Sequence, residues 1–333
     1  MNKKVIAISS GDPAGIGPEV TIKALKYLID SHKFDYSNFI VVGNKKILYQ
    51  VNEKHSLYDK LDKLNIVAVE TAGIEKIIQG EVSRYSGRAS YQYIKTAADL
   101  IKTKAANALV TAPISKDALR TAGIDYCGHT EILQALGGAK KVEMAFYGNY
   151  FNLFLITRHM ALSEALKILD AEVIYKAIVN SAVFMRQLFP KSRAIDIVAP
   201  GLNPHASENG LFGDEEERII TPAVIKARKY LRCHKQFDCI DIIGPVPADT
   251  AFYRAHKSPR KTLLLSYYHD QGLAPFKMLH FETGVNVTLG LPFIRTSPDH
   301  GTAFAIAASG TASPVSMINA IKLAFKLKPI ELI

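Results

Sequence analysis

Short runs rich in β-branched residues alternate with segments of helical periodicity along most of this chain. The runs predict buried strands at residues 4–8, 38–42, 66–69, 108–111, 195–199 and 262–266. The segments between them predict helices at residues 19–28, 90–102, 163–188 with a break near Asp170, and 215–231. This alternation is typical of an α/β protein with a largely parallel central sheet and helices on both faces.

One stretch departs from the alternation. Residues 142–147 and 150–157 flank Gly148-Asn149 and predict an antiparallel hairpin. The chain has no internal repeat and no low-complexity linker, so we expect two α/β lobes that share a sheet. The first lobe is expected to be discontinuous, with residues 1–125 and 295–333 and a closing helix at 314–327. The second lobe is expected at residues 126–294.

Charge and apolar patterning exclude several classes of function. Lys and Arg number 41 against 31 Asp and Glu, a net charge of +10, but the lysines are scattered and no basic run is interleaved with aromatic residues. We therefore expect no nucleic-acid partner. The apolar run at residues 5–8 is too short for a signal peptide or a membrane span, so a cytoplasmic location and no membrane association are expected.

A glycine-rich motif, residues 11–19, follows the first predicted strand. Its glycines at 11, 15 and 17 do not have the order G-x-G-x-x-G, and no Gly-Lys-Ser/Thr follows, so neither a Rossmann dinucleotide domain nor a P-loop is predicted. Both a nucleotide-contacting loop and a structural turn with Pro18 starting a helix remain open.

Two further polar motifs suit an anionic ligand. Gly128-His129-Thr130-Glu131 opens a predicted helix, where His129 and Thr130 either bind an anion or cap the helix. Lys277, Asn286 and Arg295 lie near predicted strand ends, and Arg295 is suited to a bidentate contact with an oxyanion. The alternative for them is a solvated loop.

Three histidines, His159, His205 and His269, each follow a predicted strand. Three imidazoles with an open position form a catalytic site for a divalent metal ion. Their separations of 46 and 64 residues provide no local support, so ordinary structural histidines remain the alternative.

Several segments together resemble the 4-hydroxythreonine-4-phosphate dehydrogenase family along nearly the whole chain. They are residues 11–20, Thr111-Ala112-Pro113 with Lys116, and residues 128–131, 201–206, 247–250, 268–273, 284–297 and 299–303. The resemblance implies a two-lobed fold like that of isocitrate and isopropylmalate dehydrogenases. It places the cofactor on the first lobe, and the metal, substrate and dimer contacts on the second.

The resemblance also implies site residues. The metal ligands are His159, His205 and His269; the substrate contacts are His129, Thr130, Lys277, Asn286 and Arg295; and the cofactor contacts are His300, Gly301 and Thr302. The general base is not identified, and Asp249 and Asp270 are its candidates.

The implied activity is oxidation of 4-phosphooxy-L-threonine at C3 by NAD or NADP, followed by decarboxylation to 3-amino-2-oxopropyl phosphate, in pyridoxal 5'-phosphate biosynthesis. It implies one divalent metal ion per site, zinc with magnesium and cobalt as alternatives. It also implies a homodimer whose active site lies at the subunit interface, with metal ligands from both subunits.

One local departure leaves the substrate open. Around His159 the family often reads Thr-His-Leu-Pro-Leu, whereas this chain has Arg158-His159-Met160-Ala161-Leu162. A paralogous dehydrogenase of 4-phospho-D-threonate or 4-phospho-D-erythronate is therefore an alternative. A non-catalytic regulator that binds a phosphate ligand is another, although a regulator could dispense with the three histidines.

Overall fold

The chain forms two compact units, each built on its own strands. The computed structural model describes residues 4–307 and 309–333. The first unit comprises Met1–Val142 and Val285–Pro329, and the second comprises Glu143–Gly284 and Ile330–Ile333. These boundaries differ from the expected 125/126 and 294/295, because the helix that starts at His129 and the strand that starts at Val285 both pack within the first unit.

The first unit has a mostly parallel sheet. Its elements are β1 (Ile6–Ser9), α1 (Gly17–Asp30), β2 (Phe39–Gly43), α2 (Lys45–His55), β3 (Ile66–Ala68), α3 (Arg84–Lys102), β4 (Ala108–Thr111), α4 (Lys116–Thr121), α5 (His129–Gly137), β10 (Val285–Leu289), β11 (Ile294–Pro298) and α11 (Val315–Lys326). Its strands have the order β3-β2-β1-β4-β11-β10. β10 runs antiparallel to β11, and the other neighbours pair in parallel.

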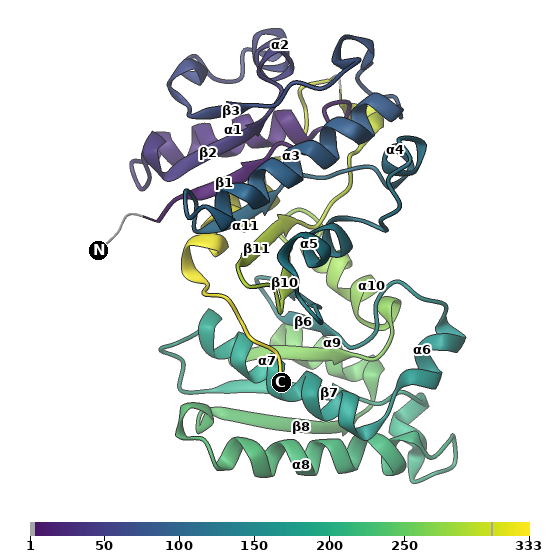
Figure 1. Cartoon of the computed structure of the whole chain (residues 1–333). Coiled ribbons are helices and arrows are strands. Elements are labelled where there is room, and N and C mark those ends of the chain that lie inside the picture. Colours follow the sequence, from purple (N-terminus) through teal and green to yellow (C-terminus); the bar gives the residue numbers. More distant parts are fainter. Residues whose placement is uncertain (1–3, 308) are drawn as a thin grey trace. The chain divides into compact units, whose positions relative to one another are not determined.

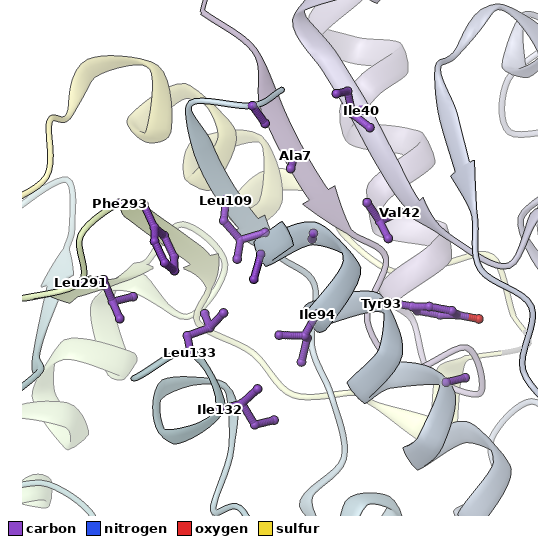
Figure 2. Close-up of a cluster of buried hydrophobic side chains, with 14 of the residues drawn as sticks. Ala7, Ile40, Val42, Tyr93, Ile94, Leu109, Ile132, Leu133, Leu291 and Phe293 are labelled. Atoms are coloured by element: carbon purple, nitrogen blue, oxygen red, sulfur yellow. The ribbon is translucent and has the colours of Figure 1, made fainter. Parts of the chain in front are cut away.

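Alternation along β2 shows how the two faces of this sheet are covered. Ile40 joins an apolar cluster with α3, whereas the Phe39 ring lies 6.0 Å from that of Phe325 on α11. Figure 2 shows this cluster, in which Ile132 and Leu133 of α5 pack toward Ile94 of α3. The packing fixes α5, and with it the position of His129 at its first turn.

The second unit contains the predicted hairpin. Its elements are β5 (Glu143–Tyr147), β6 (Asn152–Leu155), α6 (Leu162–Ile168), α7 (Ala171–Leu188), β7 (Ile195–Pro200), α8 (Thr221–Arg232), β8 (Ile240–Val246), α9 (Ala248–Lys257), β9 (Lys261–Ser266) and α10 (His269–His280). Its strands have the order β5-β6-β9-β7-β8. β5 and β6 are antiparallel, and β6, β9, β7 and β8 pair in parallel.

Helices cover the sheet of the second unit as well. α9 and α10 bury Ala251, Leu273 and Phe276 against β6, β7 and β9. α7 contacts β7 and β9, and α8 contacts β8 and runs beside it in Figure 1. The expected α/β class with a largely parallel sheet is confirmed. Among the described residues, no helix is both long and apolar enough to span a bilayer.

Candidate functional site

The three predicted metal histidines follow three neighbouring strands of the second unit. β9 lies between β6 and β7 and is parallel to both. Since Leu155 of β6 pairs with Ser266 of β9, these strands end at the same edge of the sheet. His159 follows β6, His269 follows β9 and His205 follows β7. Strand pairing therefore explains how residues so far apart in sequence come to one edge.

His159 and His269 lie side by side at this edge. Their ring centroids are 5.6 Å apart. Two imidazoles bound to one tetrahedral zinc ion have ring centres about 5 Å apart, so this pair fits a shared ion. His269 Nδ1 lies 2.7 Å from Asp270 Oδ1, which accepts its hydrogen and leaves Nε2 for coordination.

His205 lies in a strained, exposed loop. His205, Ala206, Ser207, Glu208 and Asn209 are consecutive non-glycine residues with φ between 46° and 74°. Left-handed backbone of this kind costs about 1–2 kcal/mol per residue, and such strain is concentrated at functional sites. The His205 ring lies 6.3 Å from that of Phe212. In residues 4–307 and 309–333, no three His, Cys, Asp or Glu side chains are grouped to hold a metal ion, so His205 does not join the other two here.

A buried carboxylate anchors this loop. Glu216 is 4% exposed, and its Oε1 accepts hydrogen bonds from the backbone N–H groups of Leu202 and Asn203, both at 2.7 Å. Its Oε2 accepts from Asn203 Nδ2 at 2.9 Å. Glu216 belongs to a short π-helical segment, Glu216–Ile220, a feature that is common near functional sites.

In the first unit, Arg295 is a buried cation held by neutral groups. Its Nε and Nη2 donate to Thr111 Oγ1 at 3.2 and 2.8 Å, and its Nη1 donates to Thr288 Oγ1 at 3.0 Å. Asn286 Oδ1 accepts a longer bond from Nη1, at 3.4 Å. Burial lowers the pKa of Arg295 to about 10, so the group remains charged at neutral pH.

These hydrogen bonds limit the bidentate grip expected of Arg295. Among the described residues they occupy every guanidinium N–H except one on Nη2. A second N–H becomes available on Nη1 if the long bond to Asn286 gives way. The Glu131 carboxylate acts on this guanidinium only through its charge, which raises the pKa of Arg295 and opposes the larger effect of burial. A buried charge whose hydrogen-bond partners are all neutral is costly, and an anionic ligand would offset that cost.

His129 and Thr130 occupy the first turn of α5. Gly128 is the N-cap and makes no side-chain cap, so the alternative that His129 or Thr130 caps the helix is wrong. Burial and then the charge of Arg295 lower the pKa of His129 well below its usual value, so its ring is neutral. Its Nε2 is buried and has no hydrogen-bond partner among the described residues. Thr130 is 4% exposed.

The remaining predicted substrate residues are less enclosed. Asn286 is half-buried on β10 and contacts Arg295, as described above. Lys277 is half-buried on α10, eight residues after His269 and therefore about 12 Å further along the helix.

The glycine motif supports the predicted cofactor turn. Ile16 N–H donates to Thr302 O at 3.0 Å, and a Cβ added at Gly15 would lie 2.9 Å from Thr302 O. Gly15 is therefore required for close approach of the two segments. His300 Nδ1 lies 3.1 Å from Gly301 O, within the turn itself.

Two residues of the first unit were not predicted as site residues. Thr111 holds Arg295, and its only sequence signal was the match of Thr111-Ala112-Pro113. Asp12 is fully buried behind the glycine motif, where Ala14 N–H donates to Oδ1 at 2.9 Å. Burial raises the pKa of Asp12 to about 6.

Neither candidate base has the surroundings of one. Asp249 is exposed near the start of α9 and accepts from its neighbour Thr250 N–H at 2.7 Å. The Asp270 side chain is 82% exposed and contacts His269. Asp270 is therefore better placed to orient His269 than to accept a substrate proton.

Comparison with known proteins gives a consistent result. The family described as "Pyridoxal phosphate biosynthetic protein PdxA" matches residues 27–324. A 4-hydroxythreonine-4-phosphate dehydrogenase from Beijerinckia indica is 41% identical, with 97% of this chain and 95% of the relative covered. A protein from Halalkalibacterium halodurans named "Putative D-threonate 4-phosphate dehydrogenase" is 38% identical, with 99% and 98% covered.

Solved structures agree in fold. A 4-hydroxythreonine-4-phosphate dehydrogenase from Klebsiella pneumoniae is 36% identical with a TM-score of 0.78, and 97% of each chain is covered. An isocitrate dehydrogenase from Methylococcus capsulatus is 13% identical with a TM-score of 0.52, covering 97% of this chain and 85% of that one, which shows a shared fold alone.

Proposed function

The chain belongs to the PdxA family of pyridoxal phosphate biosynthesis, and from this premise we propose that it oxidises 4-phosphooxy-L-threonine at C3. The relatives are dehydrogenases, and this chain is an oxidoreductase that uses a nicotinamide cofactor. The proposed reaction transfers a hydride to NAD+ or NADP+ and then releases carbon dioxide to give 3-amino-2-oxopropyl phosphate. The observation that carries the proposal is the pair His159 and His269, 5.6 Å apart at the edge where the β7 end also brings His205.

These three histidines would hold one divalent metal ion, zinc in preference to magnesium or cobalt, because imidazole nitrogen suits zinc. When bound, such an ion lowers the pKa of a coordinated hydroxyl and stabilises negative charge on oxygen. Asp270 orients His269 through Nδ1. The strained loop presents His205 to solvent, where it can reach a metal after a loop movement or in a second copy of the chain.

An anion site in the first unit would bind the phosphate and carboxylate groups of the substrate. Arg295 supplies the charge, and Asn286, Thr130 and the neutral His129 supply hydrogen bonds. Lys277, on α10 of the second unit, is the further cation that the resemblance assigns to substrate binding. Fixed partners of this kind orient the substrate, which can contribute several kcal/mol to lowering a barrier.

The turn at His300, Gly301 and Thr302 would bind the cofactor. A Cβ at Gly301 would meet nothing within 4 Å, so a ligand can approach its backbone closely. The Gly15 contact fixes Thr302 from behind.

A homodimer fits the exposed apolar side chains of the second unit. On α10, Met278 is 84% exposed, and Phe281 directly follows the helix at 64%. Leu211, just after the His205 loop, is 71% exposed. Apolar side chains beside the proposed metal and substrate residues favour a subunit interface at the active site. Sedimentation equilibrium of wild type and Met278→Glu tests this, because a charge there is expected to produce monomers.

A second substrate is favoured by Arg158. Its Nη1 is buried without a hydrogen-bond partner among the described residues, immediately before His159. 4-Phosphooxy-L-threonine carries an ammonium group at C2, and a cation close to that group would weaken binding of this substrate. 4-Phospho-D-threonate carries a neutral hydroxyl at C2 instead. The relative named for D-threonate 4-phosphate is 38% identical to this chain, and the relative named for 4-hydroxythreonine-4-phosphate is 41% identical.

Steady-state formation of NADH or NADPH with each substrate tests these proposals. The proposed function predicts a higher kcat/KM for 4-phosphooxy-L-threonine, together with release of carbon dioxide. A higher kcat/KM for 4-phospho-D-threonate that Arg158→Thr reverses would establish the second candidate instead. No turnover of either substrate, with tight binding of both, would indicate a regulator.

A further inference from the structure

Two side chains connect the strand ends that carry the three histidines, and both act through the backbone of Tyr267. Thr157 Oγ1 donates to Tyr267 O at 2.7 Å, two residues before His159 in its own segment. Gln271 Oε1 accepts from Tyr267 N–H at 2.8 Å, and Gln271 Nε2 donates to Gly201 O at 2.9 Å. Thr157 thus joins the segment after β6 to the segment after β9, and Gln271 joins the segment after β9 to the segment after β7.

We propose that Gln271 and Thr157 are positioning residues. Both fix the Tyr267 backbone and so set the spacing of His159 and His269 for one metal ion, and Gln271 also fixes the backbone of the loop that presents His205. This proposal rests on the proposed function, because it assigns a role to neighbours of the proposed ligands. Loss of a hydrogen bond that orients a metal ligand commonly lowers metal affinity by about 10- to 100-fold.

The chemistry at position 271 requires an amide. Tyr267 N–H can only donate and Gly201 O can only accept, so the bridge needs one acceptor and one donor at the end of the same side chain. Glutamine has both, whereas glutamate keeps the acceptor and loses the donor. These partners also fix which end of the amide is oxygen.

The Gly201 end of the bridge bears on the His205 loop. A Cβ added at Gly201 would lie 2.7 Å from Ala206 Cα, so the backbone on either side of His205 is in close contact. Gly201 N–H is itself fixed by Val246 O at 2.7 Å. Release of Gly201 O by Gln271 would therefore free one side of a strained loop.

A simpler reading is that Gln271 only caps α10. Gln271 is the third residue of that helix, where a Gln or Glu side chain commonly accepts a backbone N–H near the N-cap. Capping of α10 explains the bond from Tyr267 N–H to Gln271, but it does not explain the bond from Gln271 to Gly201, 70 residues away. The two readings differ for Gln271→Glu, which preserves a cap and breaks the bridge.

The test measures zinc affinity and amide hydrogen exchange of the full-length protein. Zinc dissociation constants are obtained by competition with a chromogenic chelator for wild type, Gln271→Glu, Thr157→Val and Thr157→Ser. Gln134→Glu is the matched control, because Gln134 Nε2 also donates to a backbone carbonyl, that of Lys140, in the first unit. Exchange is followed in the metal-free protein over residues 201–209.

We expect a zinc dissociation constant raised by about 10-fold or more in Gln271→Glu and Thr157→Val. Thr157→Ser, which keeps the hydroxyl, and Gln134→Glu should match wild type. Relative to wild type, amide exchange in Gln271→Glu should accelerate more at residues 201–209 than in the rest of the chain. A general loss of stability would accelerate exchange throughout. If Gln271→Glu does not fold, Thr157→Val with its serine rescue still tests the connection.

Two results overturn the proposal, and they are distinguishable. Wild-type zinc affinity in both Gln271→Glu and Thr157→Val, while His159→Ala and His269→Ala lose zinc, rejects the positioning role and leaves the metal site intact. Zinc binding by wild type no tighter than by His159→Ala rejects the metal site itself, and the positioning role with it.

Discussion

Thr111 Oγ1 accepts hydrogen bonds from both Nε and Nη2 of Arg295, at 3.2 and 2.8 Å. A neutral hydroxyl at the end of β4 thus holds one edge of a buried guanidinium on the neighbouring strand β11. This relationship places Arg295 without neutralising it, so its charge remains available to an anion.

Replacing Thr111 by Val should therefore impair substrate binding. Valine has nearly the same shape but leaves two buried N–H groups without acceptors, which lowers the free energy of unfolding by about 1–3 kcal/mol. The KM for the phosphorylated substrate should rise while that for the cofactor stays near wild type. Thr111→Ser keeps the hydroxyl and is the control. Equal KM values for substrate in Thr111→Val and Thr111→Ser would contradict this role.

Arg295→Lys should lower kcat/KM for the phosphorylated substrate about as much as Arg295→Ala. Lysine retains the charge but lacks the planar donors that reach Thr111 and Thr288 together. Loss of a charge-assisted hydrogen bond to substrate corresponds to about 1.5–3 kcal/mol, or about 10- to 150-fold in kcat/KM. Arg84→Lys, at an exposed guanidinium, is the control. A rise in the KM for NAD+ alone would reject Arg295 as a substrate residue.

Local patterns were sufficient to predict most of the fold. Residues 108–111 form β4 as predicted, and the break near Asp170 separates α6 from α7 because Asp170 accepts from Val173 N–H as an N-cap. The predicted Gly148-Asn149 hairpin is present as β5 and β6. The sequence placed Asn286 and Arg295 near strand ends but gave no strand bounds there, so the pairing of β10 with β11 was not predicted. β8 was not predicted either.

The site was less predictable because its contacts are non-local. No spacing in the sequence reveals that β6, β9 and β7 are neighbours, so the histidines could be grouped only by resemblance. The bonds from Thr111 to Arg295 and from Gln271 to Gly201 span 184 and 70 residues. Asp12 was overlooked because burial, which raises its pKa, is not visible in a loop sequence.

Gly301→Ala should report whether a cofactor lies on the proposed turn. The added methyl group meets nothing within 4 Å in the protein, so the melting temperature should not change. If the cofactor packs on this backbone, its KM should rise by about 10-fold or more, as expected for a steric conflict of 1.4 kcal/mol or more. Gly15→Ala is the contrasting variant, because its methyl group meets Thr302 and should lower the melting temperature. An unchanged cofactor KM in Gly301→Ala would move the cofactor elsewhere.

Asp12 should make stability depend on pH in the acid range. Its pKa of about 6 in the folded protein exceeds the ordinary 3.8, so the folded state binds this proton more tightly than the unfolded state. The protonated Asp12 therefore stabilises the folded state. This contribution to the free energy of unfolding is fully present below pH 3.8 and is lost as the pH rises through 6, a difference of about 3 kcal/mol. Asp12→Asn removes this dependence.

Melting temperatures of wild type and Asp12→Asn between pH 4 and 7.5 test that expectation. Wild type should lose stability relative to the variant as the pH rises, because other titrating groups are common to both. Asp99→Asn, at a side chain 54% exposed, should show no such trend. Parallel pH profiles for wild type and Asp12→Asn would show that Asp12 titrates normally.

The last prediction concerns the histidines and the subunit that supplies each. His159→Ala, His205→Ala and His269→Ala should each release most bound metal and abolish turnover, because the proposed catalytic site would hold its ion by three protein bonds. The fold should persist, since such an ion is not a structural staple, and His234→Ala should leave metal and activity unchanged. Metal content is measured by mass spectrometry after dialysis, alongside NADH or NADPH formation.

Subunit exchange between pairs of inactive variants then identifies which subunit supplies each histidine. If two histidines reach a site from different subunits, half of the exchanged dimers are mixed and one of the two sites in each is intact, so about a quarter of the activity returns. A pair from one subunit restores none. We expect no restoration for His159→Ala with His269→Ala, whose rings are 5.6 Å apart in one chain, and restoration when either is mixed with His205→Ala. Full metal occupancy in His205→Ala would overturn both the ligand set and the function built on it.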